Sequence, residues 1–198
     1  MLCLKLNLAL FLGLQLYGQD EREQRVEREA YSTIQSQLLQ AGATHEGPLL
    51  SNAQTLARNL ESALPDGRII ETGQFKRSAD WKQVAVVARF SRDSRPYLIQ
   101  IKVAPGVDAA AKDMAVYFSR VQAAFRPGTK SGVSIGQARY FYGCDAVVFL
   151  RLNVMIKLGP ELPGPPDRRP RSCVEDTKET EGLALKVDRE IQDIAFHR

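Results

Sequence analysis

The sequence predicts an α+β fold: one antiparallel β-sheet of five to six strands with helices packed on one face, plus two N-terminal helices. Segments rich in β-formers follow one another with only short turns between them, as the strands of hairpins do. Other segments carry apolar residues at helical spacing. No strand–helix–strand unit repeats along the chain, which argues against a doubly wound parallel sheet.

The middle of the predicted sheet is the segment 135–158, which reads as a meander. Its strands are expected at 138–142, 146–150 and 154–158. Phe, Tyr, Val and Ile suit a pleated, half-buried surface, while Gly143 and Asn153 can supply the positive φ that tight turns need. Three earlier strands are expected at 68–72, 83–90 and 97–103. The last two form a hairpin through 91–96, and each places its apolar residues on one face.

Four helices are predicted around these strands. The expected spans are 20–41, 51–64, 108–125 and 177–196. Ser51 and Gln54 match a capping box for the second helix, and Asp108 can cap the third. The third and fourth helices are expected on the apolar face of the sheet, and the first two at an edge or extending away. An alternative for the first helix is an interaction arm that docks a partner through Val26, Ile34 and Leu38.

The first eighteen residues resemble a secretory signal peptide. Lys5 gives a minimal basic region, 6–16 is apolar, and Gly18 is a small residue before the expected cleavage site. The alternative is an uncleaved N-terminal anchor. After cleavage, 19–198 is expected to form a single exported domain, periplasmic or secreted, with no transmembrane span. Its parts are a helical 19–66, a sheet with one helix at 67–158, a Pro-rich linker at 159–172 and a C-terminal helix at 173–198.

Composition narrows the partners. The chain has 198 residues with 44% hydrophobic and 25% charged residues and a net charge of +4, which is ordinary for a globular protein. A nucleic-acid-binding protein usually has a denser basic face, so we expect no nucleic acid. The basic residues of the predicted loops are compatible with anionic polysaccharide or lipid headgroups, although solvated surface charge is the simpler interpretation. These residues are Arg126, Lys130, Arg168, Arg169 and Arg171.

One catalytic motif is present. The segment 132–136 matches G-x-S-x-G, and an Asp and then His197 follow in the chain, the order that α/β-hydrolases use. Ser134 would need a turn between a buried strand and a helix, whereas a loop precedes it and a strand is expected after it. A secreted serine hydrolase using Ser134 and His197 is therefore the alternative, and a glycine-containing loop is the preferred interpretation. His45 and His197 lie in no metal-binding motif, so neither metal nor cofactor is predicted.

The cysteines predict a disulfide. If the signal peptide is removed with Cys3, Cys144 and Cys173 remain, and an even count in an exported protein favours pairing. Such a bridge would attach the far end of the Pro-rich linker to the sheet. The alternative is two unpaired thiols, one of which pairs with another chain.

The second half of the chain resembles a loose family of exported bacterial domains of unknown function. The matching residues are Gly136, Ala138, Tyr140, Asn153, Val154 and Ile156. The resemblance implies export and an α+β fold and transfers no site. Together these observations predict an exported, non-enzymatic binding or interaction module of the bacterial envelope or extracellular space.

Overall fold

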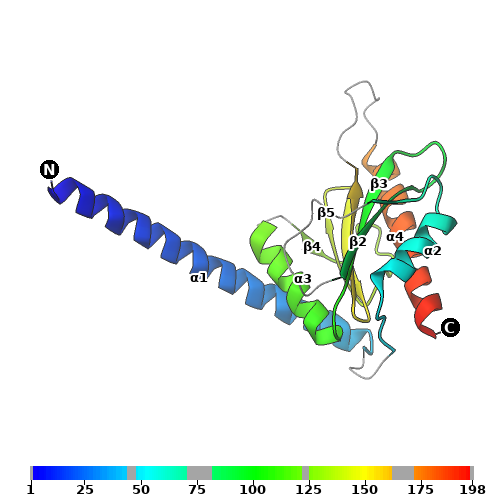
Figure 1. The fold of residues 1–198 in the computed structure, drawn as a ribbon, viewed down its shortest axis with the longest axis horizontal. Coiled ribbons are helices and arrows are strands. Elements are labelled where there is room, and N and C mark those ends of the chain that lie inside the picture. Colours follow the sequence, from blue (N-terminus) through cyan, green and yellow to red (C-terminus); the bar gives the residue numbers. More distant parts are fainter. Residues whose placement is uncertain (1, 44–47, 71–81, 122–124, 162–171, 197–198) are drawn as a thin grey trace.

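The computed structural model describes residues 2–43, 48–70, 82–121, 125–161 and 172–196. Within these ranges four helices and seven strands form (Figure 1). The helices are α1 (Leu2–Gln40), α2 (Ala53–Ala63), α3 (Val107–Val121) and α4 (Cys173–Phe196). The strands are β1 (Arg68–Ile70), β2 (Lys82–Arg89), β3 (Pro96–Val103), β4 (Arg126–Pro127), β5 (Ala138–Tyr142), β6 (Ala146–Arg151) and β7 (Val154–Pro160).

All seven strands belong to one antiparallel sheet with the order β1-β2-β3-β7-β6-β5-β4. This confirms the predicted α+β class, the hairpin and the meander. Strand β4 was not predicted, because its two residues, Arg126 and Pro127, carry no strand pattern. The last strand continues through Gly159 and Pro160 into the segment expected to be a linker.

Helices cover both faces of the sheet, so the prediction of helices on one face is wrong. The α2 and α4 helices lie on one side, and α3 with the C-terminal part of α1 lies on the other (Figure 1). The reason is visible in β6, where Val147 and Phe149 face α2 and α4 while Val148 and Leu150 face α1 and α3. An uninterrupted apolar run of this kind indicates a strand buried on both faces.

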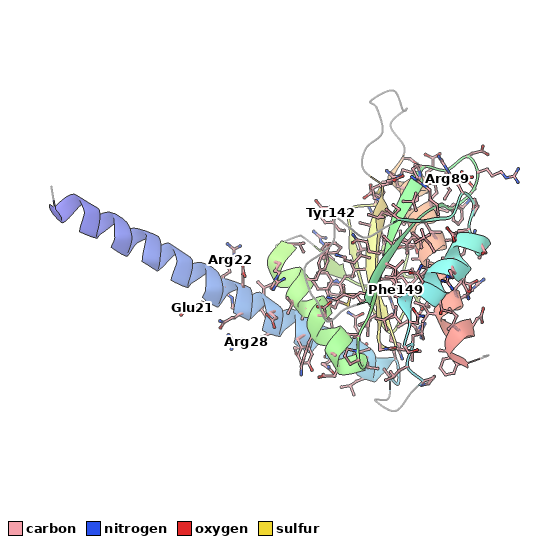
Figure 2. All side chains as sticks on the ribbon, in the orientation of Figure 1. Glu21, Arg22, Arg28, Arg89, Tyr142 and Phe149 are labelled. Atoms are coloured by element: carbon pink, nitrogen blue, oxygen red, sulfur yellow. A yellow bond between two sulfur atoms is a disulfide. The ribbon has the colours of Figure 1, made fainter. Side chains whose placement is uncertain are left out.

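The larger core lies between the sheet and the pair α2 and α4. It contains Phe149, which is fully buried in the interior (Figure 2), together with aliphatic residues of the central strands and both helices. Asn153 is a buried polar residue beside this core. Its side chain is 1% exposed and forms hydrogen bonds with the backbone of two distant loops. Its amide nitrogen donates to the Leu50 and Ala104 carbonyls at 2.7 and 2.6 Å, and its oxygen accepts from the Leu50 amide at 2.9 Å.

The smaller core lies between the sheet and the pair α1 and α3. Ile34 and Leu38 of α1 are 0% and 3% exposed and pack there beside Met114 of α3. The interaction-arm hypothesis is therefore wrong for these two residues, which bind the chain's own domain. Upstream of them α1 projects away from the sheet, where Glu21, Arg22 and Arg28 are exposed (Figures 1 and 2). Among the described residues, no helix combines the length and apolar character that crossing a membrane requires.

The helix starts differ from the predicted spans: α1 begins at Leu2, and α3 begins at Val107, so Asp108 lies within its first turn and does not cap it. The α2 helix is capped by Asn52, whose side chain accepts from the Gln54 amide at 2.9 Å, rather than by the Ser51 box. The α4 helix begins at Cys173 because Ser172 and Glu175 form a capping box, in which the Ser172 hydroxyl accepts from the Glu175 amide at 3.2 Å. Gly182 consequently lies inside α4, where a Cβ would approach the Phe90 ring to 2.5 Å.

Candidate functional site

A groove runs along the N-terminal half of α4. It has a volume of about 480 Å³ and separates α4 from the loop that leads into β5. Val133, Val174 and Leu185 give it a largely apolar lining, and the lysines Lys130 and Lys178 stand among the residues that border it. We call this feature the α4 groove. Its volume falls in the range of about 300–1,000 Å³ that small-molecule sites in proteins occupy.

The loop wall of the groove is attached to α4 by a buried carboxylate. Glu181 is 5% exposed and accepts from the backbone amides of Lys130 and Ser131 at 2.7 and 3.2 Å. The Ser131 hydroxyl also donates to it. A buried carboxylate is tolerated when donors surround it in this way. The Glu181 charge therefore fixes the loop and is already satisfied by donors within the protein.

A second carboxylate holds the same loop two turns further along α4. Asp188 is 3% exposed and accepts from the Gly136 amide at 3.1 Å. Arg151 of β6 donates to both Asp188 oxygens, each at 2.7 Å. Gly136 has a φ of 61°, and a Cβ there would lie 2.7 Å from the Leu150 carbonyl oxygen, so glycine is required. Because both carboxylates lie on one face of α4, they fix the loop from both ends.

The disulfide lies at one end of the groove. Cys144, in the turn between β5 and β6, is bonded to Cys173 at the start of α4, with a Cα–Cα distance of 5.3 Å. The structure thus confirms the predicted pair. The Lys130 ammonium lies 3.0 Å from Cys144 Sγ and 2.6 Å from Cys173 Sγ. Sequence reasoning did not connect Lys130 with the cysteines, since only the fold brings its loop beside them.

A polar network centred on Arg95 lies next to the disulfide. The Arg95 guanidinium pairs with Asp145 at 3.2 Å and with Asp176 at 3.0 Å, so it joins the β5–β6 turn to α4. Arg95 also donates to the Tyr97 hydroxyl at 3.3 Å. Burial raises the pKa of Tyr97, and hydrogen bonds from Thr180 and Arg95 lower it by less. This network keeps Asp145 and Asp176, which lie near the cysteines, paired with a cation.

The residues of the hydrolase hypothesis are not brought together within the described part of the chain. Ser134 is exposed in the loop between the Glu181 and Asp188 contacts, and the chain enters strand β5 directly after that loop. The strand–turn–helix geometry that exposes a nucleophile in an α/β-hydrolase is therefore not found around Ser134. His197, like His45, lies outside the described residues. The described residues contain no cluster of three potential metal ligands.

A second cavity of about 290 Å³ lies under α1 on the opposite face. Phe118, Phe125 and Tyr140 supply aromatic walls, and Val26 of α1 closes one side. Tyr140 is 5% exposed, and its hydroxyl makes no hydrogen bond of good geometry to the described residues. Burial raises the pKa of Tyr140, and the nearby Thr33 hydroxyl lowers it by less. This cavity lacks the lysines and the disulfide of the α4 groove.

Comparison with known proteins gives no relative from which a function could be transferred. No protein-family description, curated protein or solved structure matches the chain significantly.

Proposed function

We propose that this protein is an exported, non-enzymatic binding module that holds a single-chain amphiphile with an anionic headgroup in the α4 groove. The observation that carries the proposal is the groove itself, in which an apolar lining is bordered by lysines. The hydrocarbon chain would lie along Val133, Val174 and Leu185. Burying it gives about 0.8 kcal/mol per CH₂ group, which is the main driving force for binding.

The charged residues at the groove determine the sign of the headgroup charge that it can bind. Lys130 and Lys178 are exposed residues at the groove, whereas the carboxylate of Glu181 is buried and occupied by loop donors. An anionic head therefore meets positive charge, and a cationic head meets repulsion. Val174 is 78% exposed, so its side chain is accessible to a ligand that enters the α4 groove.

Two features support export. The N-terminal residues have the pattern of a signal peptide, and the chain carries a disulfide between Cys144 and Cys173. Disulfides persist in oxidising compartments and are rare in the cytosol. Mass spectrometry of the protein from its native host tests this part of the proposal. We expect a mature N-terminus near Gln19; an intact Met1 in a membrane fraction would instead indicate an anchor.

Calorimetric titration with dodecanoate, below its micelle-forming concentration, tests binding. We expect saturable binding to the wild type and a loss of at least about tenfold in affinity for Val174→Asp. The introduced carboxylate repels the anionic headgroup, and burying it under the hydrocarbon chain costs its hydration free energy. Leu39→Asp is the matched control, because Leu39 is 77% exposed on α1 and far from the groove. Equal binding by both variants, or equal binding of dodecanoate and dodecyltrimethylammonium, would contradict the proposal.

A further inference from the structure

The disulfide at the end of the α4 groove has surroundings that a purely structural crosslink does not need. Cys173 is an exposed residue and is one of the residues that line the α4 groove. It is also the first residue of a 24-residue helix whose N-terminus is formed by the Ser172–Glu175 capping box. The free N–H groups and the dipole at such a terminus favour negative charge on the sulfur.

Lys130 adds a second, independent source of positive charge. Its ammonium lies within 3.0 Å of Cys144 Sγ and 2.6 Å of Cys173 Sγ, so it contacts whichever sulfur leaves as a thiolate. The backbone amide of Lys130 is held by Glu181, which fixes the position from which this side chain reaches the bridge. The nearby acids are engaged elsewhere: Asp145 and Asp176 pair with Arg95, and Glu175 accepts from Ser172.

From this arrangement we propose that Cys144–Cys173 is a thiol–disulfide exchange site whose co-reactant is a dithiol. A thiolate of the dithiol attacks Cys173 Sγ, and a new S–S bond forms as the Cys144–Cys173 bond breaks. The electron pair of that bond leaves on Cys144 as a thiolate beside Lys130. The second thiolate of the dithiol then attacks the other dithiol sulfur, which is bonded to Cys173 in the mixed disulfide, and Cys173 leaves as a thiolate. The protein pair gains two electrons and two protons, and the dithiol becomes a disulfide.

Attack at Cys173 rather than Cys144 follows from exposure. Cys144 is half-buried in the turn between β5 and β6, behind which the Arg95 network lies. Cys173 opens onto the α4 groove, where an approaching molecule meets Val174 and Lys178 instead of packed side chains. The exchange needs no amphiphile, so it stands or falls separately from the binding function proposed above.

The equilibrium with dithiothreitol tests the role of Lys130. The purified mature protein is equilibrated with mixtures of reduced and oxidised dithiothreitol, quenched with acid, and its free thiols are counted by mass spectrometry after alkylation. We expect Lys130→Met to need a ratio of reduced to oxidised reagent about tenfold higher than the wild type for half-reduction, because a cation beside a thiolate favours the charged form by about that factor. Lys178→Met is the matched control, since Lys178 borders the same groove and should leave this ratio unchanged while weakening dodecanoate binding.

Single-cysteine variants test which sulfur is attacked. Cys144→Ser leaves Cys173 free, and Cys173→Ser leaves Cys144 free; circular dichroism verifies that each remains folded. We expect the Cys144→Ser variant to react with a small aromatic disulfide at least about tenfold faster, because its thiolate is exposed and lies at the α4 terminus. Equal half-reduction ratios for wild type, Lys130→Met and Lys178→Met would overturn the proposal, as would faster reaction of the Cys173→Ser variant.

Discussion

The two faces of the sheet are built in different ways. On the α2 and α4 face, buried carboxylates of α4 bind loop amides and an arginine, and a disulfide adds a covalent link. On the α1 and α3 face, alanines and aromatic rings pack together, and the ion pair there, between Asp113 of α3 and Lys102 of β3, is less buried than the Asp188–Arg151 pair. The contact of α1 with α3 is mainly apolar, with Tyr31 and Gln35 donating to Asp108 at its margin.

This difference indicates which face is adapted to hold a surface in a fixed shape. Hydrogen bonds from a buried carboxylate to backbone amides specify the position of a loop, whereas apolar contacts tolerate small shifts. The α4 groove needs such a fixed loop because that loop forms one wall. We expect substitutions in the polar contacts of α4 to change both stability and binding, and substitutions under α1 to change stability alone.

The largest expected effect is at Asp188. Asp188→Ala leaves the Arg151 guanidinium and the Gly136 amide without their acceptor, and breaking a buried pair of this kind costs about 3–5 kcal/mol. Urea denaturation measures the loss of unfolding free energy. Asp193→Ala, at an exposed position of the same helix, serves as the control and should change little. A loss below about 1 kcal/mol for Asp188→Ala would show that the loop is held by other contacts.

Removing the disulfide should have the next largest effect. The bridge closes a loop with a sequence separation of 29 residues. The chain-entropy model then predicts that the double variant Cys144→Ser, Cys173→Ser loses about 3–4 kcal/mol. The comparison is thermal and urea unfolding of the double variant against the oxidised wild type, with Val174→Ala as the neighbouring exposed control. No change in the unfolding free energy would mean that the position of α4 does not depend on the disulfide.

A smaller effect is expected from the α1 side. Ile34→Val removes one buried methylene from α1, and such changes cost about 0.5–1.5 kcal/mol. Dodecanoate affinity should stay at the wild-type value, because Ile34 lies on the face opposite the α4 groove. Leu39→Ala, exposed on the same helix, is the control for helix propensity. If Ile34→Val weakened dodecanoate binding, the two faces would not be independent.

The smallest effect concerns Lys157, which stands 4.3 Å above the Tyr117 ring on the α1 and α3 face. Burial, followed by repulsion from Lys102, lowers its pKa from the ordinary value of 10.5, and Asp113 opposes this shift. At a pH between the lowered pKa of the folded state and 10.5, Lys157 binds more protons in the unfolded chain than in the folded protein. The contribution of Lys157 to the free energy of unfolding therefore rises with pH in this window.

Lys157→Met should remove this pH dependence. Relative to the wild type, the variant should be most stabilised at neutral pH, and its advantage should shrink as pH approaches 10.5. Urea denaturation between pH 7 and about 10 gives the difference. Lys186→Met is the matched control, since Lys186 stands 4.9 Å above the Phe90 ring but is exposed. An advantage for Lys157→Met that grows with pH would contradict the assigned direction.

Much of the fold follows from local sequence patterns. Alternating apolar residues predicted β3 and the β2–β3 hairpin, runs of β-forming residues between turns predicted the β5–β6–β7 meander, and the cysteine count predicted the disulfide. The two-sided burial was missed because the alternation in β3 was extended to the whole sheet, although 147–150 is apolar at every position. That run was the available signal for helices on both faces.

The site was less predictable than the fold. Lys130 was considered only as a loop charge, and Glu181 and Asp188 were not singled out from the other polar residues of their helix. Their roles depend on a loop and a helix about fifty residues apart in sequence meeting in space, as the Lys130–Glu181 bond does. The periodicity of a helix sequence does not reveal such a contact, because the pattern is the same whether a carboxylate faces water or accepts from a buried amide.

Methyl NMR of the Val- and Leu-labelled protein titrated with dodecanoate tests the central claim, that the α4 face is the binding face, most directly. We predict shift changes at Val133, Val174 and Leu185, which line the α4 groove, and none at Val26, which closes the cavity under α1. Changes that saturate at Val26 and leave Val133, Val174 and Leu185 unmoved would contradict the account and would place the ligand site on the other face.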